Sequence, residues 1–369
     1  MTIDASQYWD RLKKELDASD DLEEQIDILR KFPRARRLEI QEKDISGKIV
    51  LPELFAELTA LAEAVLRGSY EITRTELSRR QMEPRGGFAI VAMGKFGGYE
   101  LTYRSDLDII YLYELPEDQD YFTRLGTRII SALTILTSEG IAYQIDTALR
   151  PSGNAGTLVS SLDSFREYHQ KQGRTWERQA LLRARIVIGS EDFARKVTTC
   201  FEKIIYQESD EQKLAGEIDH LRGRMEREIA KEKVGRYNLK TGRGGIVDIE
   251  FAVQFLQLLH GLKRPKVRNP NTLLAIQALM REKILDPSLA DPLEKAYLFL
   301  RLLETRIRLH LEHPSDDLIE GAEWLTELEK RFFGGQPVIP RYLEVRETVR
   351  SLYERIIRPN DQGSLPKDP

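Results

Sequence analysis

Two aspartates stand two residues apart, shortly after a pair of glycines. Gly97 and Gly98 follow a short apolar run, and Asp106 and Asp108 come next along the chain. Residues i and i+2 of a β-strand point to the same face, so the two carboxylates would lie side by side and repel each other. Magnesium prefers oxygen ligands and links carboxylates to phosphates, and a glycine turn lets backbone N–H groups approach an anion. The pattern predicts a magnesium and phosphate site, with Ser105 holding a phosphate oxygen; an aspartate-rich turn that caps a strand is the alternative.

Two further residues extend this predicted site. Asp146 ends the next strand-like run. A third carboxylate can complete a two-metal site and accept a proton from a nucleophile, although a solvent-exposed acid at a strand end is the structural alternative. Arg150 comes directly before Pro151 and close to Gly153, which fix a turn. It is a candidate phosphate clamp, with a solvated turn arginine as the equal alternative.

Arginines and an aromatic residue mark a second stretch. Arg178 and Arg185 are seven residues apart, so on one helix they would share a face. Two like charges on one face indicate an anionic partner, either a nucleotide or acidic side chains of the domain; an ordinary salt-bridged surface is the alternative. Trp176 is expected to anchor the core.

A second glycine-rich turn, at 240–245, opens an apolar helix predicted at 246–261. Asp248 and Glu250 lie in its first turn, where the helix dipole favours acids. Capping accounts for both acids. The functional alternative places them facing the metal site, with Lys240 on a phosphate.

The elements that would position these residues are mostly helical. Strand-like runs occur at 87–93, 107–113 and 141–146, and these predict one small sheet. Helical periodicity occurs at 8–17, 22–32, 51–82, 190–207, 211–232, 246–261, 270–283, 286–311 and 340–357. The fold class is therefore α+β and mostly helical. We expect a helical segment at 1–85, a core at 86–206, an all-helical domain at 207–358 and a disordered tail at 359–369.

Composition limits the classes of function. The 369 residues include 56 Lys and Arg and 60 Asp and Glu, giving a net charge of −4, which argues against coating nucleic acid or an anionic membrane. The single cysteine, Cys200, excludes an internal disulfide and a cysteine-based zinc site, and the five histidines lack a metal-ligand spacing. No apolar run reaches the ~20 residues of a membrane span, so a cytoplasmic location is expected.

Four ordered sequence blocks resemble a known family. They are residues 94–101 (GKFGGYEL) with 105–108 (SDLD), 149–159 (LRPSGNAGTLV), 173–185 (GRTWERQALLRAR) and 239–251 (LKTGRGGIVDIEF). The first block is similar to the nucleotidyltransferase superfamily typified by DNA polymerase β. Together the four resemble glutamine synthetase adenylyltransferase, also called glutamate–ammonia-ligase adenylyltransferase.

The resemblance implies a polymerase-β-like sheet and transfer of AMP from ATP to a tyrosine of glutamine synthetase, releasing pyrophosphate. It also implies a two-metal Mg²⁺ site on Asp106, Asp108 and Asp146, and a PII-type signalling protein as a further partner. Family members usually carry a second half that reverses the reaction by phosphorolysis. Only one set of blocks is present here, so a single activity is expected.

Adenylylation is the favoured direction of reaction. De-adenylylation remains the alternative, because residues 173–178 resemble that half of the family. A non-catalytic partner-binding remnant is a third interpretation, since Ala148 stands where many members have arginine.

Overall fold

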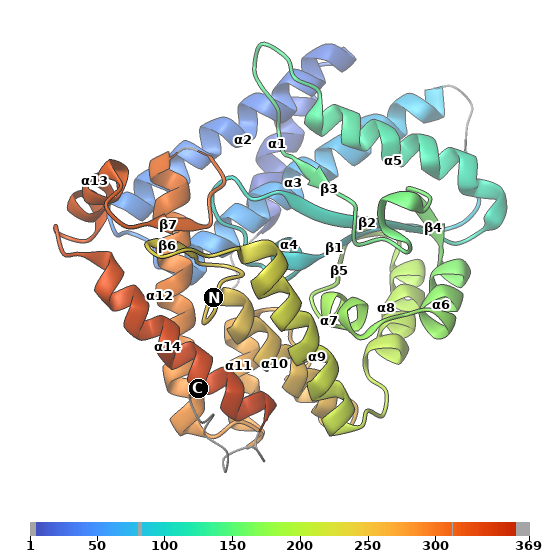
Figure 1. Cartoon of the computed structure of the whole chain (residues 1–369). Helices are drawn as coiled ribbons and strands as arrows, with labels where there is room; N and C mark the ends of the chain where they lie inside the picture. Colours follow the sequence, from blue (N-terminus) through green and yellow to red (C-terminus); the bar gives the residue numbers. More distant parts are fainter. Residues whose placement is uncertain (1–4, 80–82, 312, 359–369) are drawn as a thin grey trace. The chain divides into compact units, whose positions relative to one another are not determined.

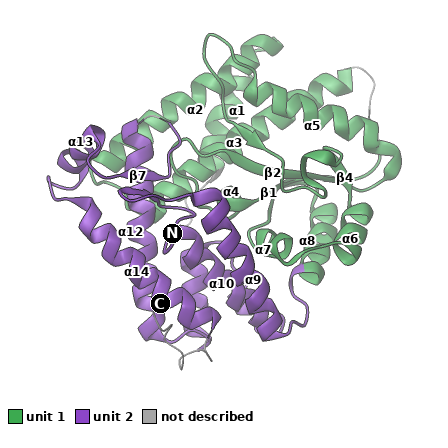
Figure 2. Cartoon of the chain, viewed as in Figure 1, with its two compact units in different colours: residues 1–204 green, residues 205–369 purple. Residues whose placement is uncertain are grey.

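The computed structural model describes residues 5–79, 83–311 and 313–358, and the chain divides into two compact units. Unit 1 spans residues 1–204 and unit 2 spans residues 205–369 (Figure 2). The tail predicted at 359–369 and the last residues of the helix predicted at 51–82 lie outside the described residues. The division into four segments stays a prediction. Within the described part of the chain, no helix combines the length and apolar character needed to cross a membrane.

Unit 1 opens with three long helices, α1 (Ala5–Leu16), α2 (Leu22–Ile45) and α3 (Leu51–Arg79) (Figure 1). α3 packs against α1, against α2 and against α5 (Gln119–Thr134). Gly68 of α3 lets the helices approach closely, because a Cβ there would lie 2.8 Å from Cδ2 of Leu29 and 3.1 Å from Cδ2 of Leu12. This helical layer supports the sheet that follows it.

The helix predicted at 22–32 is too short. α2 runs through Pro33 to Ile45, although proline lacks the N–H group that a helix interior needs. Phe32, Pro33 and Ile40 are all buried. Tertiary burial of this face therefore outweighs the local cost of the proline, which the sequence pattern alone does not reveal.

The sheet of unit 1 has five strands: β1 (Phe88–Ala92), β2 (Leu107–Tyr113), β3 (Ile145–Asp146), β4 (Val159–Ser161) and β5 (Arg185–Gly189). The order is β3-β2-β1-β5, and β4 also pairs with β2. β1 is antiparallel to β2 and to β5, whereas β3 and β4 run parallel to β2. The three predicted strands all belong to this sheet, which confirms the α+β fold class. Only the last two residues of the run at 141–146 pair as a strand.

The remaining helices of unit 1 are α4 (Gly94–Gly97), α5, α6 (Leu162–Lys171), α7 (Thr175–Leu181) and α8 (Glu191–Ile205). α5 connects β2 to β3 and packs against α3 and β4. A crossover helix of this kind is what a parallel strand pair requires.

The environment of His169 in α6 makes the stability of unit 1 depend on pH. Its ring lies 4.4 Å from the Phe165 ring centroid and 5.2 Å from that of Tyr168. Burial lowers the pKa of His169, and Glu177 offsets this only partly. The unfolded chain therefore takes up this proton first, so the stability linked to His169 is complete above the ordinary value of about 6.5 and is lost as pH falls below it.

His169→Gln is expected to lose less thermal stability than the wild type between about pH 7.5 and pH 5.5. Melting curves at the two pH values measure the difference. A variant that loses as much as the wild type would contradict the role of His169.

The described residues of unit 2 form mainly helices, together with one short strand pair. Its helices are α9 (Glu211–Met225), α10 (Ile246–His260), α11 (Thr272–Arg281), α12 (Pro287–Leu311), α13 (Glu323–Phe332) and α14 (Val338–Ile357). α10 packs against α9, α11, α12 and α14, which explains its apolar composition. β6 (Arg236–Asn238) pairs antiparallel with β7 (Asp317–Ile319), so the domain is not all-helical as predicted. The helix predicted at 211–232 ends earlier, passing into a π-helical turn at Glu226–Ala230.

Candidate functional site

The glycine turn begins where β1 ends and lies directly against Asp108. The N–H of Met93 donates to the carbonyl oxygen of Asp108 over 2.8 Å. Gly94 has a φ of +51°, and a Cβ at this position would overlap the Asp108 carboxylate. Glycine is required there for both reasons. The antiparallel pairing of β1 with β2 thus brings the turn and the first carboxylate together.

Gly97 and Gly98 are both buried, and their N–H groups serve the turn itself. The N–H of Gly97 donates to the Met93 carbonyl and that of Gly98 to the Gly94 carbonyl, closing the short helix α4. A Cβ at Gly97 would overlap the carbonyl oxygen of Arg183, so this glycine permits close backbone packing. The predicted contact of these two glycines with phosphate stays a prediction.

The strand register places two of the three predicted carboxylates side by side. Asp108 of β2 pairs with Asp146 of β3 in the parallel ladder. Asp106 lies just before β2 and is exposed, as is Asp146, whereas Asp108 is half-buried. Oδ1 of Asp146 accepts the N–H of Ala148 over 2.7 Å. Among the described residues, no group of three or more His, Cys, Asp or Glu side chains is arranged to hold a metal ion.

Ser105 and Arg150 both contact their own loops. The Ser105 hydroxyl accepts the N–H of Thr102 over 3.1 Å, which leaves its hydrogen able to donate elsewhere. Nη1 of Arg150 donates to the carbonyl and the hydroxyl of Thr147, and to Asn154 over 3.3 Å. Both side chains therefore shape the loops on either side of the carboxylate pair. Their phosphate contacts stay predictions.

The prediction that Arg178 and Arg185 share one face of a helix is wrong. α7 ends at Leu181, and Arg185 begins β5, where the β-branched run at 186–188 joins the sheet beside β1. Trp176 is also not a core anchor, because it lies in the first turn of α7 and is 38% exposed. Arg185 instead pairs with Glu63 of α3, so one of its partners is an acidic side chain of the same unit.

Several residues that hold the turn in place have no signal in the sequence. Arg183 and Glu100 form a buried ion pair with an N to O distance of 3.2 Å. The hydroxyl of Tyr103 donates to Asp44 of α2 over 3.0 Å, and the N–H of Leu101 donates to Thr59 of α3. Each partner lies dozens of residues away along the chain. Only the assembled fold shows that helices α2 and α3 and the segment before β5 support one turn.

Tyr99 gives a test of the turn's backbone. Its φ is +57°, in the left-handed region that costs a residue with a Cβ about 1–2 kcal/mol. Tyr99→Gly and Tyr99→Ala both remove the ring, but only glycine adopts this φ freely. Tyr99→Gly is therefore expected to be the more stable variant by about 1 kcal/mol, measured by urea unfolding. Equal stabilities, or a more stable alanine variant, would show that the turn relaxes to another conformation.

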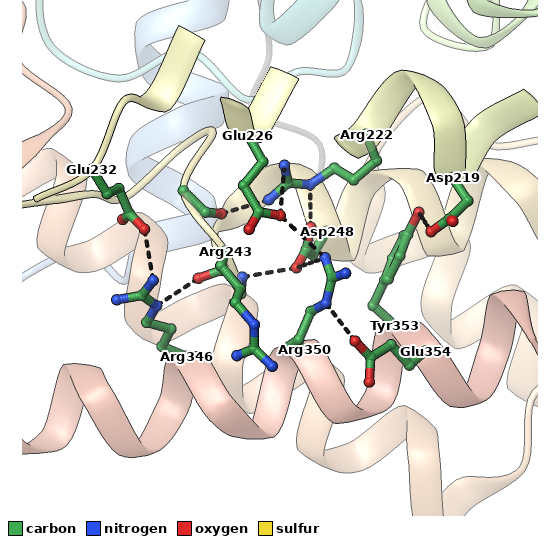
Figure 3. Close-up of polar contacts among 12 residues, drawn as sticks. Asp219, Arg222, Glu226, Glu232, Arg243, Asp248, Arg346, Arg350, Tyr353 and Glu354 are labelled. Carbon is green, nitrogen blue, oxygen red and sulfur yellow. Dashed lines mark hydrogen bonds and ion pairs between the residues drawn. The ribbon is translucent and has the colours of Figure 1, made fainter. Parts of the chain in front are cut away.

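The residues predicted in the second glycine-rich turn belong to unit 2. Asp248 is fully buried and pairs with Arg222 of α9 and, over 3.6 Å, with Arg350 of α14 (Figure 3). It also accepts the N–H of Gly244, the residue before the N-cap Gly245, over 2.8 Å; of the two predicted acids only Asp248 lies in the first turn of α10. The functional alternative for Asp248, Glu250 and Lys240 stays a prediction.

Comparison with known proteins agrees with the residue blocks. Residues 2–199 match the family model described as glutamate-ammonia ligase adenylyltransferase, and residues 212–356 match the model of GlnD PII-uridylyltransferase. The first match alone covers more than half of the chain.

Three similar proteins all bear the name bifunctional glutamine synthetase adenylyltransferase/adenylyl-removing enzyme. The one from Nitrosococcus oceani is 35% identical over 312 residues, covering 79% of this chain and 32% of its own length. The protein from Vibrio parahaemolyticus is 32% identical and covers 85% of this chain and 36% of its own length. The protein from Thioalkalivibrio sulfidiphilus is 34% identical and covers 92% of this chain and 35% of its own length. This chain thus spans about a third of the length of these relatives. It belongs to the glutamate–ammonia-ligase adenylyltransferase family.

Proposed function

We propose that this chain transfers AMP from ATP to a tyrosine of glutamine synthetase and releases pyrophosphate. One observation carries the proposal: in a chain of this family, the glycine turn abuts Asp108, and Asp108 stands in register with Asp146. A turn beside paired carboxylates suits a triphosphate carried with a divalent cation.

The donor set at this edge of the sheet fits Mg²⁺. Magnesium in nucleotide sites is usually held by one or two carboxylates together with substrate phosphates. Asp108 and Asp146 would supply these carboxylates, with Asp106 as a third acid near the start of β2. When bound, the ion would neutralise charge on the phosphates and act as a Lewis acid. We propose Mg²⁺ as the cofactor and ATP as the substrate on this basis.

The proposed role of Asp146 is to accept the proton of the target tyrosine. A free phenol has a pKa of about 10 and is a weak nucleophile at neutral pH. Oδ1 of Asp146 already accepts a backbone N–H, so we assign Oδ2 as the acceptor. The phenol oxygen then forms a bond to the α-phosphorus, and the bond from the α-phosphorus to the pyrophosphate oxygen breaks.

The reverse activity is the second candidate. The names of the three relatives include an adenylyl-removing function, and this chain spans only about a third of each. That reaction would take phosphate and modified glutamine synthetase and release ADP. The third interpretation, a non-catalytic remnant, rests on Ala148. Here the backbone N–H of Ala148 caps Asp146, a contact that any residue except proline can make.

One experiment separates these functions. The purified chain is incubated with unmodified glutamine synthetase, ATP and MgCl₂, and separately with adenylylated glutamine synthetase and phosphate. A tyrosine that gains the mass of AMP, together with pyrophosphate, is the expected result. ADP release in the second mixture alone would establish the reverse enzyme instead. No product in either mixture would leave the partner-binding remnant.

A PII-type signalling protein is a further proposed partner. The match of residues 212–356 to a PII-uridylyltransferase model supports it. We also propose the cytoplasm as the compartment, because ATP and the proposed protein substrate are found there.

A further inference from the structure

The loop between β1 and β2 is held in a conformation that its sequence does not favour. Tyr99 and Arg104, which both carry a Cβ, have φ of +57° and +56°. Residues with a Cβ rarely adopt this region, and such strain persists only where the surrounding structure imposes it. Some group outside the loop must therefore fix it.

Arg185 of β5 contacts this loop at three points. Its Nε donates to the carbonyl of Gly97 over 3.3 Å and its Nη2 to the carbonyl of Phe96 over 3.2 Å. The guanidinium carbon lies 3.8 Å from the centroid of the Tyr99 ring. Arg185 thus holds two consecutive carbonyls of α4 and the ring of the first strained residue.

The guanidinium of Arg185 is itself fixed from the other side. Nη2 also pairs with Oε1 of Glu63, which belongs to the long helix α3. Both side chains are largely buried, with 16% and 21% of their area exposed. A planar guanidinium with carbonyls, a carboxylate and a ring around it has little freedom to turn.

We propose that Arg185 is a positioning residue that locks the glycine turn in its nucleotide-binding conformation. It acts through the carbonyls of Phe96 and Gly97 and the Tyr99 ring, and does not touch the nucleotide. A turn held in this way needs no rearrangement when the triphosphate arrives, so binding free energy is not spent on ordering it. The inference rests on the proposed function, because the ligand of the turn is taken to be ATP with Mg²⁺.

Arg30 provides a matched control for Arg185. It is also a buried arginine of unit 1, and it donates to the carbonyls of Ile26, Ile135 and Gly140. Replacing either arginine with glutamine removes a charged donor from backbone carbonyls. Only one of the two sites lies at the glycine turn.

The test measures binding of a non-hydrolysable ATP analogue with Mg²⁺ by titration calorimetry on the full chain. Arg185→Gln is expected to raise the Kd about 10-fold, since a hydrogen bond to a charged group is worth roughly one decade in affinity. Arg185→Lys keeps the positive charge but lacks the planar set of N–H donors of a guanidinium, so it should recover part of the lost affinity. Arg30→Gln should lower the melting temperature and leave the Kd unchanged.

Glu63→Gln keeps the proposal testable if Arg185→Gln does not fold. It leaves Arg185 in place without its counter-charge, and a smaller rise in Kd, about 3-fold, is expected. Unchanged affinity in all of these variants, or an equal loss in Arg30→Gln, would overturn the positioning role. A wild-type chain that binds the analogue but transfers no AMP would refute the proposed function alone. A wild-type chain that binds no nucleotide would refute both.

Discussion

The Asp108→Asn variant is expected to transfer AMP more slowly than the wild type by a factor on the order of 10³. Asp108 is half-buried, lies against the glycine turn and stands in register with Asp146. Asparagine keeps the size of the side chain and one acceptor oxygen but removes the charge that would hold a cation. The loss should therefore fall on the chemical step and on metal affinity.

Stability distinguishes this role from a structural one. Two carboxylates at paired positions of a β-ladder repel each other, at a cost of roughly 0.2–1 kcal/mol. Asp108→Asn relieves that repulsion in the metal-free chain. A rate that falls much further than the melting temperature therefore places Asp108 in the reacting site, whereas replacing a structural aspartate would lower the two together.

The measurement pairs initial rates of AMP incorporation with melting curves for each variant. Asp163→Asn is the matched control: it changes an exposed acid of unit 1 that pairs with nearby Arg166 on α6. Its rate should stay at the wild-type level. The proposal fails if Asp108→Asn keeps its rate, or if its rate falls only in proportion to a lost fold.

Local patterns were enough to predict the carboxylate edge of the sheet. The β-branched and aromatic run at 107–113 coincides with β2, and the run at 141–146 ends in β3, where Asp146 pairs with Asp108. Residue type, spacing and strand geometry are all local properties. The glycine turn is equally predictable. A Cβ at Gly94 or Gly97 would collide with neighbouring atoms, so the fold requires glycine at these positions and the residue type itself marks the turn.

Long-range contacts explain what the sequence could not predict. Helical spacing predicts that Arg178 and Arg185 share a helix face. The helix instead ends at Leu181, because residues 185–189 pair with β1 as a strand. Glu63 and Glu100 have no spacing that links them to an arginine, and only the fold brings Arg185 and Arg183 to them. Asp248 was placed correctly in the first turn of a helix, but its two arginine partners lie on α9 and α14, and no spacing rule connects them.

Removing one partner of the Arg222–Asp248 ion pair is expected to destabilise unit 2 by about 3–5 kcal/mol. Both side chains are almost fully buried, and Arg222 also donates to the carbonyl of Gly242. Asp248→Asn would leave the Arg222 guanidinium buried, with the carboxylate of Glu226 3.7 Å away to offset part of its charge. Arg222→Met would leave the Asp248 carboxylate with Arg350 at 3.6 Å. Each single variant thus strands a charge that the interior solvates poorly.

The double variant Arg222→Met/Asp248→Asn separates this cause from simple loss of contacts. With neither charge present, its destabilisation should fall below the sum of the two single variants by about 2–3 kcal/mol. Arg224→Met is the control, since the exposed pair of Arg224 with Glu228 lies on the same stretch of chain and its loss should have little effect. Strictly additive single variants would mean that the pair has no coupling and that the burial of both charges is incidental.

Hydrogen exchange on the full chain shows where the stability is lost. The buried polar contacts around Asp248 join α9, α10 and α14 to the second glycine-rich turn (Figure 3). Arg222 donates to the carbonyl of Gly242, and Arg346 donates to the carbonyl of Arg243. Faster exchange is therefore expected in the turn at 239–245 and in the helices that meet there, while the sheet of unit 1 keeps its protection. Because a chain of two units can unfold in steps, this local readout assigns the loss to unit 2 where a single melting temperature would average over both. If the turn exchanged no faster in Asp248→Asn than in the wild type, Asp248 would not be what fixes the backbone that carries Lys240.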